Sequence, residues 1–232
     1  MNRTNDAFAF QKHAAQHISH ELKTPIAVLV SELERAKNIP DEKTKNEVIE
    51  NQINKAKSLA DVITVLLEIS KNESGNEISL ETIRLDELIF NGIEELSITN
   101  PEFRFEISFK PDNIHENQLE LKANTLLINQ AFLNVMRNCI FYSLNPQAKI
   151  IFDGTAANQI SISFINEGNP IAPEEEKYLF DHFYKGSNNP RLTGFGLGLV
   201  LTKKIVELHH GSITYSNPSG NKIQFDISFP LS

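Results

Sequence analysis

Apolar and small side chains in the first third of the chain recur at helical spacing. Between residues 15 and 33 they step mostly by three and four, and from Ile49 to Ser70 they step by four and three. Residues 38–41, Asn-Ile-Pro-Asp, interrupt the pattern between the two series. The spacing predicts a helical hairpin with its apolar seams on one face. Because two lone helices bury little surface, we expect a homodimer forming a four-helix bundle. The alternative is a hairpin packed on the second domain.

The pattern changes after the polar stretch at residues 72–77. Beyond it, alternation predicts strands over residues 104–109, 149–152, 159–165, 212–215 and 223–229. Helical spacing covers residues 85–96, 125–143 and 197–209. The expected fold is an α+β sandwich, with helices on one face of a mixed, mostly antiparallel sheet. We expect a helical domain over residues 1–72, a linker over 73–80 and the sandwich domain over 81–232.

Composition narrows the class of protein. The 232 residues carry a net charge of -8, which argues against nucleic acid as a partner because such proteins usually present a basic patch. The single cysteine, Cys139, cannot form an internal disulfide and fits a reducing compartment. No apolar run approaches the ~20 residues of a membrane helix. We expect a cytoplasmic chain, attached to a membrane only through segments absent from it.

The motif Ser-His-Glu-Leu-Lys-Thr-Pro at residues 19–25 holds the first candidate chemistry. His20 falls off the apolar seam, so we expect its ring to face solvent, where a neutral ring nitrogen is a nucleophile near neutral pH. Glu21 can accept the proton that leaves, and Thr24 places a hydroxyl one turn on. The alternative interpretation is a surface histidine on an amphipathic helix.

Three segments of the second domain suit a nucleotide. Asn134 and Asn138 lie four residues apart on one helix face, and amide oxygens suit Mg²⁺. Asn166 ends a predicted strand, and Gly168 after it allows close approach of a flat ring. Glycines at alternate positions then open a helix, where backbone N–H groups suit phosphate: Gly194, Gly196 and Gly198. Taken singly, a polar helix stripe or an ordinary turn explains the first two segments equally well.

In this order these motifs, together with Phe-Asp-His-Phe at residues 180–183, resemble the H, N, first glycine, F and second glycine boxes of sensor histidine kinases of two-component systems, over nearly the whole chain. The resemblance implies a Bergerat-type ATP-binding domain, ATP and Mg²⁺ as cofactors, and a response regulator receiver domain as partner. It also implies that His20 is the phosphoacceptor, that Glu21 is its base, and that Thr24 helps to position water for dephosphorylation of the partner. Asn138 would coordinate Mg²⁺. The other implied nucleotide-binding residues are Asn134, Tyr142, Asn166, Gly168, Ile171, Lys185, Gly194, Gly196, Leu197 and Gly198.

Three positions depart from the family pattern. Asn166 stands where an adenine-reading aspartate is usual, Pro170 where a second glycine is common, and Phe141 where a lysine is expected. The leading hypothesis is a kinase core that autophosphorylates His20, transfers the phosphoryl group to a regulator aspartate and also acts as its phosphatase. The first alternative is a nucleotide-binding scaffold or phosphatase-biased protein with weak kinase activity. The second is an ATPase or serine kinase without histidine chemistry.

Overall fold

The computed structural model describes residues 23, 25–73, 79–181, 184, 196–218 and 220–231. The chain separates into two compact units. The helical unit comprises Met1–Ile78 with Arg191–Leu197, and the sheet unit comprises Ser79–Pro190 with Gly198–Ser232. His20, Glu21 and Thr24 lie outside the described residues, as do Lys185 and Gly194.

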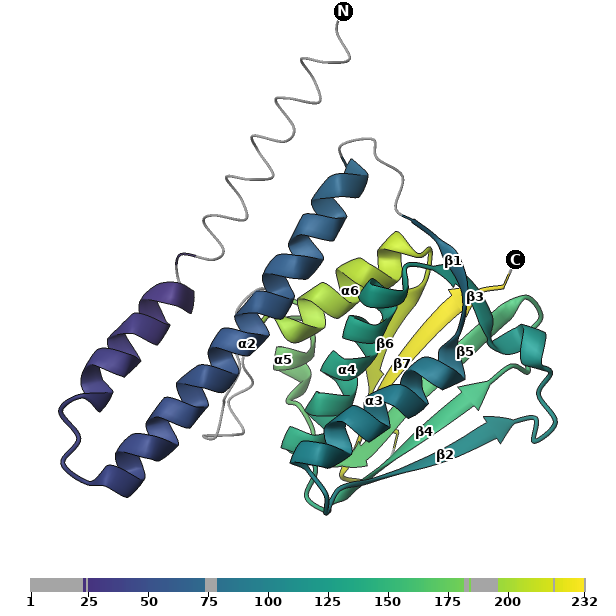
Figure 1. Ribbon diagram of the computed structural model, residues 1–232. Helices are drawn as coiled ribbons and strands as arrows, with labels where there is room; N and C mark the ends of the chain where they lie inside the picture. The colour runs from purple at the N-terminus through teal and green to yellow at the C-terminus, as the bar shows by residue number, and fades with distance from the viewer. Residues whose placement is uncertain are drawn as a thin grey trace, which may run out of the picture. The chain divides into compact units, whose positions relative to one another are not determined.

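The helical unit contains the predicted hairpin. Residues 25–36 are helical, and the chain turns back through residues 37–41 into α2 (Glu42–Glu73), as Figure 1 shows. Asp41 fixes this start: its Oδ2 accepts a hydrogen bond from the Thr44 backbone N–H at 2.8 Å and another from the Thr44 hydroxyl. These bonds favour the carboxylate and lower the pKa of Asp41. The break expected at residues 38–41 is therefore confirmed.

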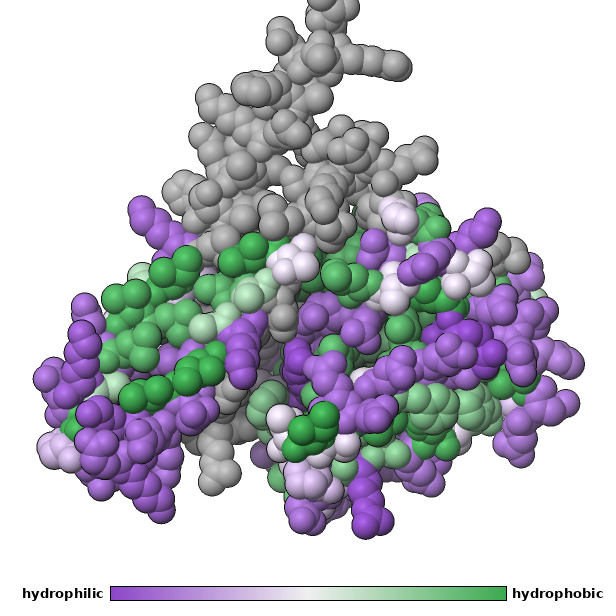
Figure 2. Space-filling model, in the orientation of Figure 1, coloured by the Kyte–Doolittle hydropathy of each residue, from purple (hydrophilic) through white to green (hydrophobic). Residues whose placement is uncertain are grey.

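Apolar side chains occupy more than one face of the hairpin. Leu59, Val62 and Val65 of α2 are buried, whereas Ile53 in the predicted seam is 41% exposed. The helix of residues 25–36 also exposes four large apolar side chains: Ile26, Val28, Val30 and Leu33. Figure 2 shows apolar surface gathered along these helices, at the left of the view. Across the described helices, none is both long and apolar enough to cross a bilayer.

The sheet unit is built on a five-stranded sheet in the order β2-β4-β5-β7-β6. The strands are β2 (Arg104–Lys110), β4 (Gln147–Asp153), β5 (Gln159–Glu167), β6 (Ser212–Ser216) and β7 (Lys222–Pro230). Only β2 and β4 pair in parallel, and the other neighbours are antiparallel. All five strands were predicted from alternation, and the mixed, mostly antiparallel sheet is confirmed.

Three helices cover one face of this sheet: α3 (Leu85–Thr99), α4 (Thr125–Tyr142) and α6 (Gly198–Leu208) (Figure 1). Burial alternates along β5, where Ile160, Ile162 and Phe164 are fully buried. The intervening serines are partly exposed, and the Ser161 and Ser228 hydroxyls share a hydrogen bond across to β7. A helix-covered apolar face and a more polar open face account for the alternation that the sequence displays.

Four short elements have no counterpart in the predicted set. β1 (Glu81–Arg84) and β3 (Glu120–Ala123) pair in a two-stranded antiparallel sheet. The 3₁₀ helix η1 (Glu116–Leu119) directly precedes β3. The last is α5 (Pro173–Glu176). Strands and helices of four residues are too short to display a period, so the pattern does not reveal them.

His209 connects the end of α6 to the start of α4. Its Nε2 accepts the backbone N–H of Asn124 at 3.1 Å, so Nδ1 carries the proton and donates to the Ile205 carbonyl at 2.7 Å. The Asn124 side chain in turn caps α4 by accepting the Leu127 N–H at 3.0 Å. Only the neutral imidazole can make this pair of bonds. Burial disfavours the charged ring and lowers the pKa of His209.

We expect this junction to make stability depend on pH. As the pH falls below ~6.5, the histidine of the unfolded chain takes up a proton before the folded one does, so the free energy of unfolding decreases. Replacing His209 by Leu is expected to cost about 1–3 kcal/mol at pH 7.5, because the Asn124 N–H loses its acceptor. The variant should also lose part of the pH dependence. Urea unfolding at pH 5.5 and 7.5 measures both effects.

His210→Asn is the control for this prediction. His210 is exposed and has a positive φ of 60°. Asparagine tolerates this backbone conformation. The control should keep most of the pH dependence, and equal pH dependence in wild type and His209→Leu would contradict the role given to His209.

Candidate functional site

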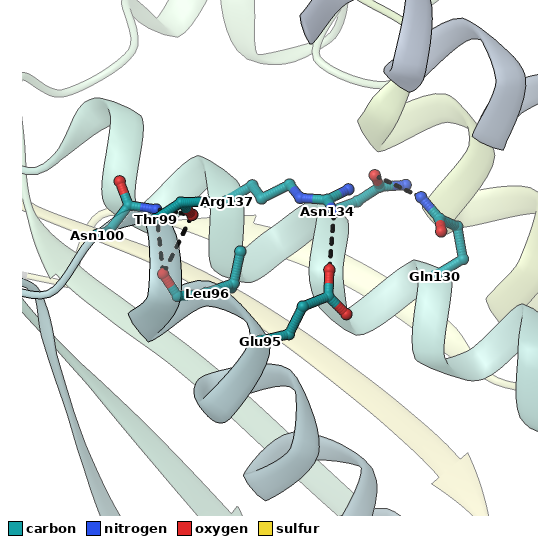
Figure 3. Close-up of polar contacts among 7 residues, drawn as sticks. All are labelled: Glu95, Leu96, Thr99, Asn100, Gln130, Asn134 and Arg137. Atoms are coloured by element: carbon teal, nitrogen blue, oxygen red, sulfur yellow. Dashed lines mark hydrogen bonds and ion pairs between the residues drawn. The ribbon is translucent and has the colours of Figure 1, made fainter.

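The two α4 asparagines of the predicted motif differ in their surroundings. Asn134 has two polar neighbours: Gln130 donates to its Oδ1 at 3.4 Å, and its Nδ2 donates to the carbonyl of Gly198 at 3.4 Å. Figure 3 shows Gln130, Asn134 and Arg137 along α4, with Glu95 of α3 paired to Arg137 at 3.2 Å. Asn134 is thus the contact between α4 and the first residue of α6, while Arg137 joins α4 to α3.

Asn138 lies one turn further along α4 and is partly exposed. Within the described residues its side chain makes no hydrogen bond, so its amide oxygen is available to a ligand. The next residue, Cys139, is buried, and burial raises the pKa of its thiol to about 12. Cys139 is therefore a core side chain and not a nucleophile. Desolvation also raises the pKa of the Tyr142 phenol at the helix end.

Asn166 occupies the end of β5, on the helix-covered face of the sheet. It is only 4% exposed, and its strand neighbours are Ala148 of β4 and Ile223 of β7. Its Nδ2 donates to the Glu167 carbonyl at 3.4 Å, near the limit for a hydrogen bond. Its Oδ1 accepts no hydrogen bond from any described residue. The Asn166 amide oxygen is therefore available to a donor on a ligand.

Gly168 lies where β5, β7 and the end of α4 meet. A Cβ added there would be 2.6 Å from Ile223 Cδ1 and 2.7 Å from the carbonyl oxygen of Tyr142. No side chain fits at these distances, so this position requires glycine for close packing. The Gly168 N–H donates to the Asn221 carbonyl at 2.6 Å, which fixes the turn after β5. Gly168 thereby holds Asn166 beside the end of α4.

The start of α6 combines a glycine of positive φ with a helix N-terminus. Gly196 has a positive φ of 72°, which favours glycine, and Leu197 is buried at 4% exposure. α6 begins at Gly198, where an added Cβ would be 3.8 Å from the nearest atom of Asn134. A helix of this length presents N–H groups and a positive partial charge at its N-terminus, which suit an anion.

Three residues position the site without belonging to a recognisable motif. Asn145 Nδ2 donates to the Glu167 carboxylate at 2.6 Å, and the Tyr215 hydroxyl accepts the Ile171 N–H at 3.2 Å. The third, Ile223, packs against Gly168. These contacts depend on strand pairing and loop closure, which no local spacing encodes.

The predicted site residues fall into three groups. Contacts connect Asn134 with Gly198, and Tyr142 and Asn166 with Gly168. Among the described residues, no hydrogen bond joins Asn138 or Ile171 to one another or to these two sets, and Gly196 and Leu197 directly precede Gly198 in the chain. His20, Glu21, Thr24, Lys185 and Gly194 lie outside the described residues, so their roles stay predictions.

Two family models match the chain. One, described as "His Kinase A (phospho-acceptor) domain", covers residues 11–75. The other, described as "Histidine kinase-, DNA gyrase B-, and HSP90-like ATPase", covers residues 123–232 and supports ATP as the nucleotide. The second match includes all the described site residues, from Asn134 to Gly198.

Curated relatives and solved structures agree with these matches. The heme sensor protein HssS of Staphylococcus aureus is 29% identical over 221 residues, which is 95% of this chain but 47% of HssS. The chain thus spans about half the length of the curated relatives it matches. The histidine kinase AdeS of Acinetobacter baumannii has a TM-score of 0.64 at 22% identity, over 92% of this chain and 98% of that one. The histidine kinase ThkA, in complex with the response regulator protein TrrA, has a TM-score of 0.64 at 24% identity, over 100% of this chain and 64% of that one. The two structures share the fold.

Proposed function

Because this chain belongs to the two-component sensor histidine kinases, we propose that it phosphorylates His20 with ATP and transfers the phosphoryl group to an aspartate of a response regulator receiver domain. The observation that supports the proposal is that α4 contacts both of the other segments within the sheet unit: its end packs against Gly168 after β5, and Asn134 in its middle contacts Gly198 at the start of α6. The domain division at residues 1–72 and 81–232, with a linker between, is part of the proposal.

Each segment has a separate task in nucleotide binding. Asn166 binds the edge of the base, with Gly168 and Ile171 beneath the ring and Tyr142 at its side. The α6 N-terminus from Gly196 to Gly198 binds the phosphates, joined by Gly194 and Lys185. Asn138 supplies an oxygen ligand to Mg²⁺, with Asn134 near the phosphates. When bound, Mg²⁺ neutralises charge on the phosphates.

The reaction at His20 is a phosphoryl transfer. A neutral imidazole nitrogen attacks the γ-phosphorus of ATP, a P–N bond forms, the bond from the γ-phosphorus to the β,γ-bridging oxygen breaks, and ADP leaves. Glu21 accepts the proton from the other ring nitrogen. The protein contributes mainly positioning and electrostatic stabilisation. When the protein acts as a phosphatase, Thr24 helps to position the water that dephosphorylates the regulator.

We further propose that the helical unit dimerises with a second copy of this chain. The exposed apolar side chains support this, since Ile26, Val30, Leu33 and Ile53 are each at least 41% exposed. Burial of such side chains stabilises association by about 25 cal/mol per Å². ThkA was solved with a response regulator, and a partner of the same class is proposed for this chain.

Labelling with γ-³²P-ATP and Mg²⁺ tests the proposed function. Wild type should acquire protein-bound label, and His20→Gln should acquire none. His17→Gln is the matched control, because it removes another histidine of the same segment, and it should be labelled like wild type. Equal labelling of wild type and His20→Gln would overturn the proposal.

Phe141 favours a second candidate function, a nucleotide-binding, phosphatase-biased protein with weak kinase activity. Its side chain is 57% exposed in the last turn of α4, a turn that has no basic residue. A cation there would assist phosphate binding, and its absence weakens the case for fast phosphoryl transfer. Tight ADP binding without label on His20, together with Thr24-dependent dephosphorylation of a regulator, would favour this alternative.

A further inference from the structure

Among the buried polar side chains of the described sheet unit, Asn166 has the weakest hydrogen bonding. The other three each make at least one hydrogen bond of 3.1 Å or less: Asp86, Thr202 and His209. Asn166 makes a single bond, from Nδ2 to Glu167, at 3.4 Å. The Asn166 amide therefore keeps an acceptor oxygen and donor capacity that no described residue uses, and both are available to a ligand.

Whether residue 166 carries an amide or a carboxylate determines which purine base it can bind. A carboxylate only accepts hydrogen bonds, whereas an amide offers an acceptor oxygen and a donor nitrogen. The 6-amino group of adenine is a donor, and its N1 is an acceptor. Hypoxanthine and guanine reverse both, with a 6-oxo acceptor and an N1–H donor. A carboxylate facing the 6-position therefore favours adenine and repels a 6-oxo purine.

We propose that Asn166 makes the nucleotide site tolerant of the purine base, so that 6-oxo purine nucleoside triphosphates bind as well as ATP. This inference rests on the proposed function, because it assumes that Asn166 faces the base. Turning the amide by half a turn exchanges Oδ1, which accepts from the adenine amine, for Nδ2, which donates to a 6-oxo group.

The surroundings of Asn166 permit this exchange. The torsion that turns a terminal amide is broad and roughly two-fold, so neither orientation is strongly preferred by the side chain itself. The bond at 3.4 Å to the Glu167 carbonyl is too long to fix one orientation. Glu167 does not restore the missing acid, since it lies on the alternate face of β5, where its carboxylate accepts from Asn145 at 2.6 Å.

The test compares ATP with ITP, which differs from ATP only at the 6-position and N1. Calorimetric titration of the whole chain with each nucleotide and Mg²⁺ gives the two Kd values. For wild type we expect them to agree within about tenfold, because a neutral amide can pair with either base. Asn166→Asp should raise the ratio of the ITP Kd to the ATP Kd by at least about tenfold, since charge-assisted bonds are roughly twice as strong.

Two further variants keep the test decisive. Asn113→Asp adds the same charge at an exposed position in the loop after β2 and should leave the ratio unchanged. Asn166→Ala removes both donor and acceptor, so both nucleotides should weaken by a similar factor, and a loss confined to ATP contradicts the inference. Thermal unfolding midpoints establish that each variant is folded.

The outcomes separate this inference from the proposed function. A wild type that binds ATP but rejects ITP by about 100-fold or more overturns base tolerance and leaves the kinase proposal standing. An Asn166→Asp variant with the wild-type ratio also overturns it. A folded protein that binds neither nucleotide overturns both proposals.

Discussion

Asn138→Ala is expected to reduce autophosphorylation by at least about 100-fold, the scale on which loss of one preorganised catalytic group acts. The side chain makes no hydrogen bond to any described residue, so its removal should cost the fold little. The loss should instead come from the metal: an amide oxygen that coordinates Mg²⁺ cannot be replaced by a methyl group. Initial rates of labelling from γ-³²P-ATP, measured over a range of Mg²⁺ concentrations, give the effect.

Asn129→Ala is the matched control for this prediction. Asn129 is also a partly exposed residue of α4. It lies nine residues before Asn138, which is two and a half helical turns, so it is on the opposite face of the helix. Its rate of labelling should stay within about twofold of wild type, as surface substitutions away from a site usually have small effects. Similar rates for both variants would remove Asn138 from the metal site.

Gly168→Ala is expected to lower the free energy of unfolding by about 1–3 kcal/mol, the usual cost of overpacking. The new methyl group would lie 2.7 Å from the carbonyl oxygen of Tyr142, a backbone atom that moves only if the end of α4 moves. Because the same displacement separates Asn166 from α4, ADP affinity should fall by about tenfold or more, in line with the cost of small misplacements. Urea unfolding and calorimetry measure the two quantities.

Gly92→Ala in α3 tests whether any added methyl group has this effect. Its nearest neighbours would be flexible side chains, Leu133 and Met136, at 3.4 Å, and alanine is the better helix former. Stability and ADP affinity should both stay close to wild type. If Gly168→Ala behaves the same way, the close packing at Gly168 does not position the site.

The sequence was informative wherever a residue pattern reflects burial. Alternation located β5 and β7 because one face of each strand is covered by helices and the other is partly exposed. Helical spacing located α4 and α6 for the same reason. The pattern does not reveal the short strands β1 and β3, because four residues contain too few alternations to establish a period.

The motif residues of the candidate site were predictable from the sequence, but the residues that pack against them were not. Asn134, Asn166 and Gly168 follow from local spacing, yet the contact that requires a glycine at 168 comes from Ile223 and Tyr142, which are distant in sequence. Strand pairing of β5 with β7 creates it. The partnership of His209 with Asn124 likewise joins residues 85 positions apart. Long-range contacts of this kind leave no local signal.

A crystal structure of the whole chain with Mg²⁺ and a non-hydrolysable ATP analogue would show directly whether these residues bind the nucleotide. We expect the base at Asn166 and Gly168, the phosphates at the start of α6, and the metal bound to the Asn138 oxygen. Finding the nucleotide elsewhere on the sheet unit, or Asn138 turned away from the metal, would contradict this expectation.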